Sequence, residues 1–488
     1  FNNTGTLSNL YSGRFDNEGT LNNNDGGVVI NYSNDNLNNN GTLNNNIGGV
    51  LINQYNIGAD YLNRGLVNTG TLNNAGEIRN QGNLFNKATL NNTGTLSNNG
   101  TLNNTGTLNN NGTLNNTGRL QILVGSTFDN TNGTLNNDGV LNLNTDLVLG
   151  STVAGIINLD TDGELNNNAN LSIHSGSTQL NAGRINNNGT LNNAGTLNNA
   201  GRLDLNAGSA FDNTVGTLNN DGVFNLNTDM ALGSAVAGII NLNAGGELNN
   251  NAHLSVRSGD TQQNNGVLNN ASNLTNSGTL VNNASGTLNN NGMLSNDGSL
   301  DNSGMLSNEG AFVSSSQSVI NGSGTYTQTA GSTIINGTVT QASVSINGGE
   351  LKGSGTINAD VNIGDLGSVN PGNSPGSLTV FGDFTTSGLF GVEIGGLLAG
   401  TEYDELDVNG VASLGGTLNV VFYDLGLGLF EASAGDSFNI LSAESIIGEF
   451  DLLSLAALGD GLFWEVDYLI DYAGGPTDFV QLNVLSAA

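Results

Sequence analysis

Residues 70–118 read GTLNNAGEIRNQGNLFNKATLNNTGTLSNNGTLNNTGTLNNNGTLNNTG. The stretch holds eight consecutive six-residue repeats, most of which begin Gly-x-Leu. Small residues mark their register at positions 70, 76, 82, 88, 94, 100, 106, 112 and 118. Every repeat requires the same surroundings as its neighbours, so the chain cannot build a core from distinct elements. The repeats therefore predict a chain that stacks on itself.

The pattern within one hexad predicts which side chains face inward. In residues 100–105, a strand period of two places Leu102 and Asn104 on one face and Thr101 and Asn103 on the other. One leucine per short strand is too little to bury alone, so like strands must lie above and below it at about 4.8 Å. We expect leucines to stack on leucines and inward asparagines to form amide ladders, with glycine supplying backbone freedom at the corners.

The spacing of the inward apolar residues predicts the number of sides of each coil. Near the N-terminus, steps of eight and six residues separate Leu7, Phe15, Leu21, Val29, Leu37, Leu43 and Leu51. Three steps close after about 22 residues, and three regular hexads close after about 18. We therefore predict an all-β, three-sided β-solenoid, or β-helix, with coils of about 18–22 residues and a right-handed path.

A longer repeat lies over the hexads. Residues 118–183 recur as residues 201–266, so that Phe128 matches Phe211 and Leu143 matches Leu226. Duplication of whole coils explains this, because inserting complete turns leaves the flanking stack unchanged. Disorder is the alternative for so polar a sequence, but the strict leucine period argues against it.

Composition and charge exclude several function classes. The chain has 73 glycines, no cysteine, 41 acidic and only 9 basic residues, and a formal net charge of -32. Such an acidic chain is a poor ligand for nucleic acid or anionic membranes, so we expect neither partner and no insertion into a membrane. Without cysteine, neither disulfides nor thiolate metal sites contribute. No signal peptide opens the chain, so an exported protein would be a processed form.

The composition changes along the chain and predicts four segments. Residues 1–311 are an asparagine- and glycine-rich solenoid, residues 312–366 are final coils of different composition, and residues 367–376 are a Pro/Gly junction or rigid corner. Residues 377–488 are expected to form a small antiparallel, sandwich-like β domain containing Trp464. Its expected strands are 377–381, 389–394, 406–408, 417–423, 437–441, 463–468 and 479–485. Residues 446–462 are a helix or a loop.

The last third of the chain resembles known bacterial surface proteins. The motifs SGTI after Gly353, PGNSPGSLTV from Pro371, YDELDV from Tyr403 and GDSFNIL from Gly435 resemble the passenger end of autotransporters. The asparagine-rich part is similar in style to filamentous haemagglutinin. The resemblance implies an exported, rod-like protein at the surface of a bacterium. From this sequence we expect neither the translocating barrel of autotransporters nor the short sorting tail of related exported proteins.

No arrangement of residues predicts catalysis, so we expect no enzyme and no cofactor. His174 and His253 occupy different places in the duplicated blocks and are expected to be surface residues. Asp160, Asp162 and Glu164 are the candidates for a Ca²⁺ site, with a simple acidic corner as the favoured alternative. The remaining acidic group, Glu402, Asp404, Glu405 and Asp407, is interpreted as a solvated strand face. Outward threonine rows (Thr95, Thr101, Thr107 and Thr113) have ice or glycan binding as alternatives to plain β-propensity.

The first coil carries the leading functional hypothesis. Because the repeat begins at once, we expect an uncapped coil whose edge recruits another chain through Phe1, Leu7, Phe15 and Leu21. Docking of this coil on the C-terminal region of the next subunit predicts a head-to-tail extracellular filament or matrix fibre. The alternative is a monomeric cell-surface adhesin, in which the solenoid is a stalk and a glycan or another cell is the partner.

Overall fold

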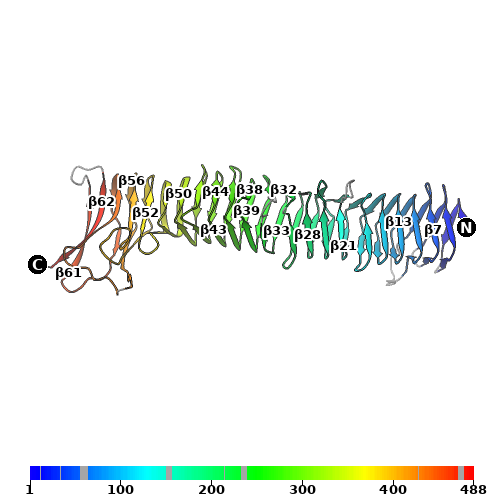
Figure 1. Cartoon of the computed structure of the whole chain (residues 1–488), viewed down its shortest axis with the longest axis horizontal. Helices are drawn as coiled ribbons and strands as arrows, with labels where there is room; N and C mark the ends of the chain where they lie inside the picture. Colours follow the sequence, from blue (N-terminus) through cyan, green and yellow to red (C-terminus); the bar gives the residue numbers. More distant parts are fainter. Residues whose placement is uncertain are drawn as a thin grey trace. The chain divides into compact units, whose positions relative to one another are not determined.

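The computed structural model describes residues 1–10, 13–32, 35–54, 64–149, 156–213, 215–231, 239–426, 428–470 and 477–487. These residues form 62 strands (Figure 1). Among them, no helix is long and apolar enough to cross a membrane. Contacts divide the chain into two compact units, Phe1–Leu248 and Asn249–Ala488, which we describe separately.

Parallel strands of unit 1 stack with a period of three, which confirms the three-sided β-solenoid. Thr71 lies opposite Thr89 in the regular hexads, and Leu21 lies opposite Leu43 near the N-terminus. These pairs match the shorter and the longer predicted coil, so both lengths are confirmed, whereas handedness stays a prediction. The first strands are β1 (Asn2–Asn3), β2 (Thr6–Asn9), β3 (Arg14–Asn17), β4 (Thr20–Asn23), β5 (Val28–Asn31), β6 (Asn36–Asn39), β7 (Thr42–Asn45), β8 (Val50–Asn53) and β9 (Leu66–Asn68). The hexad strands are β10 (Thr71–Asn74), β11 (Glu77–Asn80), β12 (Asn83–Asn86), β13 (Thr89–Asn92), β14 (Thr95–Asn98), β15 (Thr101–Asn104), β16 (Thr107–Asn110), β17 (Thr113–Asn116) and β18 (Arg119–Ile122).

Inward leucines and asparagines fill the interior as the hexad predicts. Leu102 and Asn104 are both fully buried. Asn80 donates through Nδ2 to Asn98 Oδ1 at 2.6 Å, and Asn98 donates to Asn116 Oδ1 at 2.6 Å. Each amide thus satisfies the next, and in the hexad region three such ladders run along unit 1. Their members are Asn3, Asn23, Asn45, Asn74, Asn92, Asn110 and Asn130; Asn17, Asn39, Asn68, Asn86 and Asn104; and Asn9, Asn31, Asn53, Asn80, Asn98, Asn116 and Asn137.

The interior ladders have a direction. Each asparagine donates to the next coil along the chain, so the first member of a run has no donor from the coil before it. Asn181 follows Leu159 in its column, and Asn276 of unit 2 follows Val256. The Oδ1 atoms of both asparagines are buried without a hydrogen-bond partner. Asn167 follows Leu143 in the same way, but its Oδ1 accepts a hydrogen bond from the backbone N–H of Ala169 at 3.3 Å. Where an aliphatic residue precedes a ladder, the first acceptor therefore depends on a donor outside the ladder.

The corner glycines are needed for close approach between coils. A Cβ added to Gly112 would lie 2.2 Å from the carbonyl oxygen of Gly94 in the preceding coil. Gly94 and Gly112 have no positive φ, so these corners do not use the backbone freedom expected of glycine. The same register position holds alanine at Ala88, which fits a requirement for a small side chain.

Unit 2 continues the three-strand period with longer strands. Its last strands are β50 (Thr338–Gly353), β51 (Thr356–Pro371), β52 (Ser377–Val380), β53 (Phe384–Thr386), β54 (Leu389–Ile394), β55 (Glu405–Val408), β56 (Val411–Leu414), β57 (Thr417–Phe422), β58 (Ser437–Ala443), β59 (Ser445–Gly448), β60 (Leu452–Ser454), β61 (Leu462–Leu469) and β62 (Asp478–Ser486). All seven strands expected here are present. Residues 446–462 contain β60 and most of β59 instead of a helix.

The antiparallel part of unit 2 is smaller than predicted. Strands β52, β53 and β54 pair in parallel with β55, β56 and β57, which pair in parallel with β58, β59 and β60. Antiparallel pairing joins β62 to β58 and to β61. The Pro/Gly segment does not end the stacking, because Pro371 is the last residue of β51 and needs no donor there. The segment connects β51 to β52, which pairs with β51 in parallel, and its rigidity stays a prediction.

Aromatic residues fill the core beneath these last coils. Phe390 stacks on Phe450 with ring centroids 5.7 Å apart, and Phe438 packs 6.0 Å from Trp464. Aromatic burial of this kind supplies a conventional core where asparagine ladders are absent.

Candidate functional site on the outer face of unit 1

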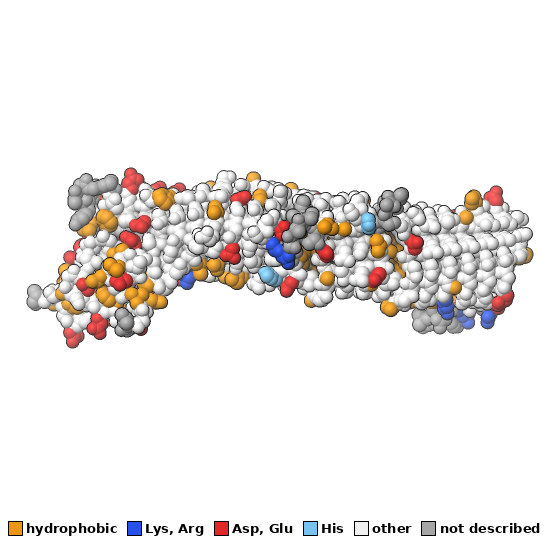
Figure 2. Space-filling view, in the orientation of Figure 1, with side chains coloured by type: hydrophobic (Ala, Val, Ile, Leu, Met, Phe, Trp, Pro, Cys, Tyr) orange, Lys and Arg blue, Asp and Glu red, His pale blue; other side chains and the backbone are white. Residues whose placement is uncertain are grey.

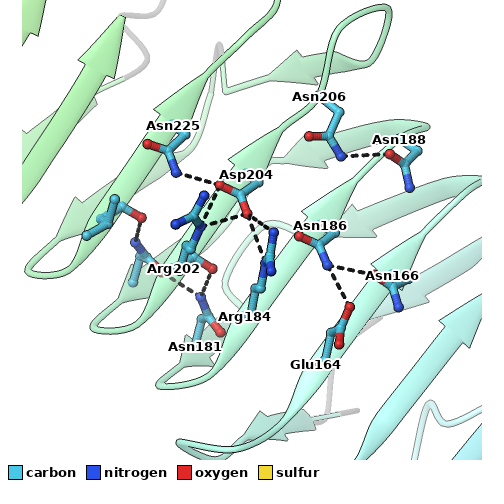
Figure 3. Close-up of polar contacts among 12 residues, drawn as sticks. Glu164, Asn166, Asn181, Arg184, Asn186, Asn188, Arg202, Asp204, Asn206 and Asn225 are labelled. Carbon is cyan, nitrogen blue, oxygen red and sulfur yellow. Dashed lines mark hydrogen bonds and ion pairs between the residues drawn. The ribbon is translucent and has the colours of Figure 1, made fainter.

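One outer face of unit 1 brings together two of the 9 basic residues of the chain and two carboxylates. It is formed by β24 (Glu164–Asn167), β27 (Arg184–Asn187), β30 (Arg202–Leu205) and β33 (Val223–Leu226), which pair in parallel in that order. The first and third residues of each strand point outward, because the second and fourth fill the interior. We name Glu164, Arg184, Asn186, Arg202 and Asp204 the arginine cluster (Figure 3).

Two guanidinium groups in the arginine cluster share one carboxylate. Arg184 approaches Asp204 Oδ2 through Nε at 3.0 Å and Nη2 at 2.9 Å. Arg202 Nε donates to both oxygens of Asp204 at 2.9 Å. The Asp204 side chain is 4% exposed, whereas those of Arg184 and Arg202 are 50% and 52% exposed. The guanidinium groups are therefore held in place while much of their surface faces solvent.

The arginines and an amide determine the charge state of Asp204. Burial acts to raise the pKa of this carboxyl, but hydrogen bonds from Arg202 and Asn225 and the charges of both arginines outweigh it. The pKa of Asp204 is consequently below its ordinary value, and the carboxylate is charged at neutral pH.

Asp204 interrupts an outer amide ladder. In this row Asn186 donates to Asn166 Oδ1 at 2.7 Å, and Asn225 donates to Asp204 Oδ1 at 2.5 Å. An asparagine at position 204 would donate to Asn186 in the same way, but a carboxylate has no proton to give. Asn186 Oδ1 is accordingly buried without a partner. The aspartate thus costs the fold a hydrogen bond that asparagine would supply.

Glu164 extends the arginine cluster by one coil. Its Oε1 accepts a hydrogen bond from Asn186 Nδ2 at 2.8 Å, so this carboxylate, too, is fixed in position. The face therefore presents donors and acceptors side by side, with two positive and two negative groups. Figure 2 shows that uncharged side chains cover most of the face of the molecule that it draws.

The calcium candidates do not come together. Asp160 and Asp162 lie exposed in the turn before β24, whereas Glu164 lies on the outer face and contacts Asn186. Over the residues that the structure describes, no group of three His, Cys, Asp or Glu side chains is arranged to hold a metal ion. A simple acidic corner at these residues stays a prediction.

The residues of the expected assembly interface lie in two different environments. Phe1 is 71% exposed, and Phe1, Leu7 and Phe15 line a cavity of about 390 Å³ at the first coil. Leu21 is 1% exposed because it stacks against Leu43 in the second coil. Leu21 is therefore a core residue and cannot contact a partner in this conformation.

The remaining candidates are placed as follows. His174 and His253 are both exposed, which confirms them as surface residues. The prediction of a solvated acidic strand face is wrong for Asp404, which is 1% exposed and accepts hydrogen bonds from the backbone N–H groups of Gly376 and Glu393, both at 2.8 Å.

Sequence reasoning missed the arginine cluster, although a signal for it was present. Arg184 and Arg202 are separated by the length of three regular hexads, and they lie directly opposite each other in neighbouring coils. Asp204 occupies a position where the hexad pattern favours asparagine. Two arginines at the same position of successive coils, with an acidic residue where the pattern favours asparagine, would have indicated a cluster. The total number of basic residues hid this signal, because so few of them seemed too scattered to form a site.

Comparison with known proteins shows little similarity. No family model matches the chain, and no curated protein matches it. Among solved structures, it is similar to the crystal structure of a TibC-catalysed hyper-glycosylated TibA fragment, with 15% identity, a TM-score of 0.16 and coverage of 70% of this chain and 93% of that one. A similarity this slight says nothing about function. The β-solenoid itself agrees with the predicted resemblance to autotransporter passengers, whereas the resemblance to filamentous haemagglutinin stays a prediction.

Proposed function

We propose that this chain is an adhesin-like β-solenoid, secreted or displayed on a bacterial surface, and that the arginine cluster is a surface at which it binds glycans. The proposal needs neither a catalytic residue nor a cofactor. Inward leucines and asparagines hold the coils together, so the outward residues are free to vary without loss of the fold.

One observation carries the proposal. Asp204 leaves Asn186 Oδ1 without a donor, whereas asparagine at the same position would complete the ladder. A residue that departs from the repeat pattern at the expense of a hydrogen bond within the ladder marks a candidate functional site. What Asp204 does provide is a fixed position for two half-exposed guanidinium groups.

The geometry of the arginine cluster suits the hydroxyl groups of sugars. Guanidinium, amide and carboxylate groups are planar, and each can meet two neighbouring hydroxyls at once. Here these groups are already fixed by contacts with one another, so binding loses little side-chain entropy. Balanced charge in the cluster favours a neutral or weakly charged glycan over a highly sulfated one.

The test is a glycan array probed with the whole chain and with the double variant Arg184→Gln/Arg202→Gln. We expect at least a tenfold loss of binding to the glycans that the wild type retains. Arg79→Gln is the matched control, because Arg79 forms an exposed pair with Glu77 elsewhere in unit 1. No glycan bound by the wild type, or equal binding by the double variant, would refute this role.

A head-to-tail filament is the second candidate, favoured by one observation. Phe1, Leu7 and Phe15 line the cavity at the first coil, and an apolar surface of this kind can receive another chain. We expect long fibres of constant axial repeat in electron micrographs, and their loss in Phe15→Asp. Leu10→Asp is the control, since Leu10 is 44% exposed outside the cavity. Single rods at all concentrations would reject the filament.

A further inference from the structure

A small polar pocket lies on the outer face of unit 2, far along the sequence from the arginine cluster. Its volume is about 230 Å³, slightly below the range of drug-sized ligand sites, which suits a ligand of one ring. Strands β50, β51, β54 and β57 form it, and the corner after β51 contributes Gly372 and Ser374. Its charged lining residues are Glu350, Lys352, Glu393 and Asp404.

A glycine opens the floor of this pocket. Gly391 of β54 lies between Asn370 and Asn419 of the neighbouring strands. A Cβ on Gly391 would lie 1.8 Å from Asn370 Oδ1, the end of a flexible side chain. An alanine here would thus push the Asn370 amide into the space that the pocket now offers.

The charges in the pocket are not balanced. Lys352 Nζ lies 2.9 Å from Glu350 Oε2, and Asn370 Nδ2 donates to Glu350 Oε1 at 2.7 Å, so Glu350 is compensated. Glu393 Oε2 is buried and has no hydrogen-bond partner. Over the described residues, neither Glu393 nor Asp404 forms an ion pair. Glu393 is half-buried, and a carboxylate with one oxygen buried and unpaired is stabilised by a donor that carries positive charge.

Asp404 agrees with this description of the pocket. Burial raises the pKa of its carboxyl to about 7, backbone hydrogen bonds from Glu393 and Gly376 act in the opposite direction, and the charge of Glu393 adds to the rise. The site therefore lacks a cation near its two inner carboxyl groups. No group of three acidic or histidine side chains among the described residues could hold a metal, so the missing cation is better supplied by an organic ligand.

We infer that this pocket binds an amino sugar, with its protonated primary amine at Glu393 and its hydroxyls at the amides of Asn370 and Asn419. A sugar is favoured over a lysine side chain because most of the lining is polar, whereas the methylene groups of lysine require apolar walls. The site is independent of the arginine cluster, so either can fail without the other.

The test is calorimetric titration of the whole chain with D-glucosamine, using N-acetyl-D-glucosamine as the neutral probe and N-acetyl-lysine amide as the non-sugar amine. We expect glucosamine to bind at least tenfold more tightly than either. Glu393→Gln should weaken glucosamine binding at least tenfold, and Gly391→Ala should abolish it. Glu431→Gln, an exposed acid outside the pocket, should change nothing.

A variant that is expected to bind glucosamine more tightly distinguishes a specific effect on binding from a loss of folding. Lys352→Gln removes the cation from the pocket, so we expect it to bind glucosamine several-fold more tightly than the wild type. Circular dichroism checks that each variant is folded. Equal binding of glucosamine and its N-acetyl form, tight binding of the lysine probe, no binding of glucosamine, or an unchanged Glu393→Gln would each overturn the inference.

Discussion

Replacing one interior asparagine tests whether the amide ladders hold the solenoid together. In Asn98→Leu, Asn116 Oδ1 loses its only donor and becomes a buried unsatisfied acceptor, while Asn80 Nδ2 retains its hydrogen bond to the carbonyl of Thr101 at 3.1 Å. An orphaned buried polar group costs about 1–3 kcal/mol. Leucine fits the space, as Ile122 does at an equivalent position after Asn104. We therefore expect unfolding to become easier by about 2 kcal/mol.

Hydrogen exchange measured by mass spectrometry, together with urea unfolding, gives both the size and the direction of the effect. Because the ladder donates toward the C-terminal side, protection should fall more in β17, which holds Asn116, than in β11, which holds Asn80. Asn99→Leu is the matched control, since Asn99 is exposed, and it should stay within about 0.5 kcal/mol of the wild type. Equal stability of the two variants, or a symmetric loss of protection, would refute the reasoning.

Three further predictions concern packing and charge. Gly112→Val should lower the free energy of unfolding by more than about 2 kcal/mol in urea titrations, since the carbonyl of Gly94 lies 2.2 Å from where a Cβ would be and the branched side chain of valine needs more room than the alanine at position 88; an unchanged midpoint would show that neighbouring coils can move apart without loss of stability. Asp204→Asn should lower the free energy of unfolding by less than about 1 kcal/mol, well below the roughly 3–5 kcal/mol typical of a broken buried ion pair, because asparagine restores the ladder. A loss of about 4 kcal/mol in the same urea titrations would contradict this. Asp404 has its pKa raised by burial to about 7, so its stabilising contribution is complete below pH 3.8 and is lost as the pH rises through about 7. Calorimetry between pH 4 and 8 should show this loss, at most about 4 kcal/mol, and Asp404→Asn should remove it.

The repeating part of the fold could be predicted because each hexad determines which of its side chains face inward and stacks on hexads of the same pattern. Leu102 and Asn104 point inward, and both coil lengths follow from the spacing of apolar residues alone. The role of the corner glycines could not be read in this way. Their requirement comes from the carbonyl of the preceding coil, as at Gly112 and Gly94, and a contact between coils has no sequence signature of its own.

The end of unit 2 was predicted less well for a similar reason. Short strands such as β53 and β56 alternate too briefly to be recognised, and whether a strand pairs in parallel depends on a neighbour far along the chain. Asp404 illustrates the consequence for sites. Its neighbours in sequence indicated a solvated face, but the backbone of Gly376 and Glu393 encloses it.

Because each interior asparagine donates its hydrogen bond to the next coil along the chain, the first and the last asparagine of a ladder have different requirements. A run can stop before an aliphatic residue without penalty, since Asn137 turns its amide to the carbonyl groups of Gly139 and Glu164 when Leu159 follows it. A run that begins after one needs another donor for its first oxygen: Asn167, which follows Leu143, accepts from the backbone N–H of Ala169 at 3.3 Å, whereas the oxygen of Asn181 has no partner. The direction of the ladders therefore limits how coils can be duplicated. An aliphatic residue is tolerated in the coil after an asparagine ladder, whereas a ladder that starts in the coil after an aliphatic residue needs a new hydrogen-bond donor for its first asparagine.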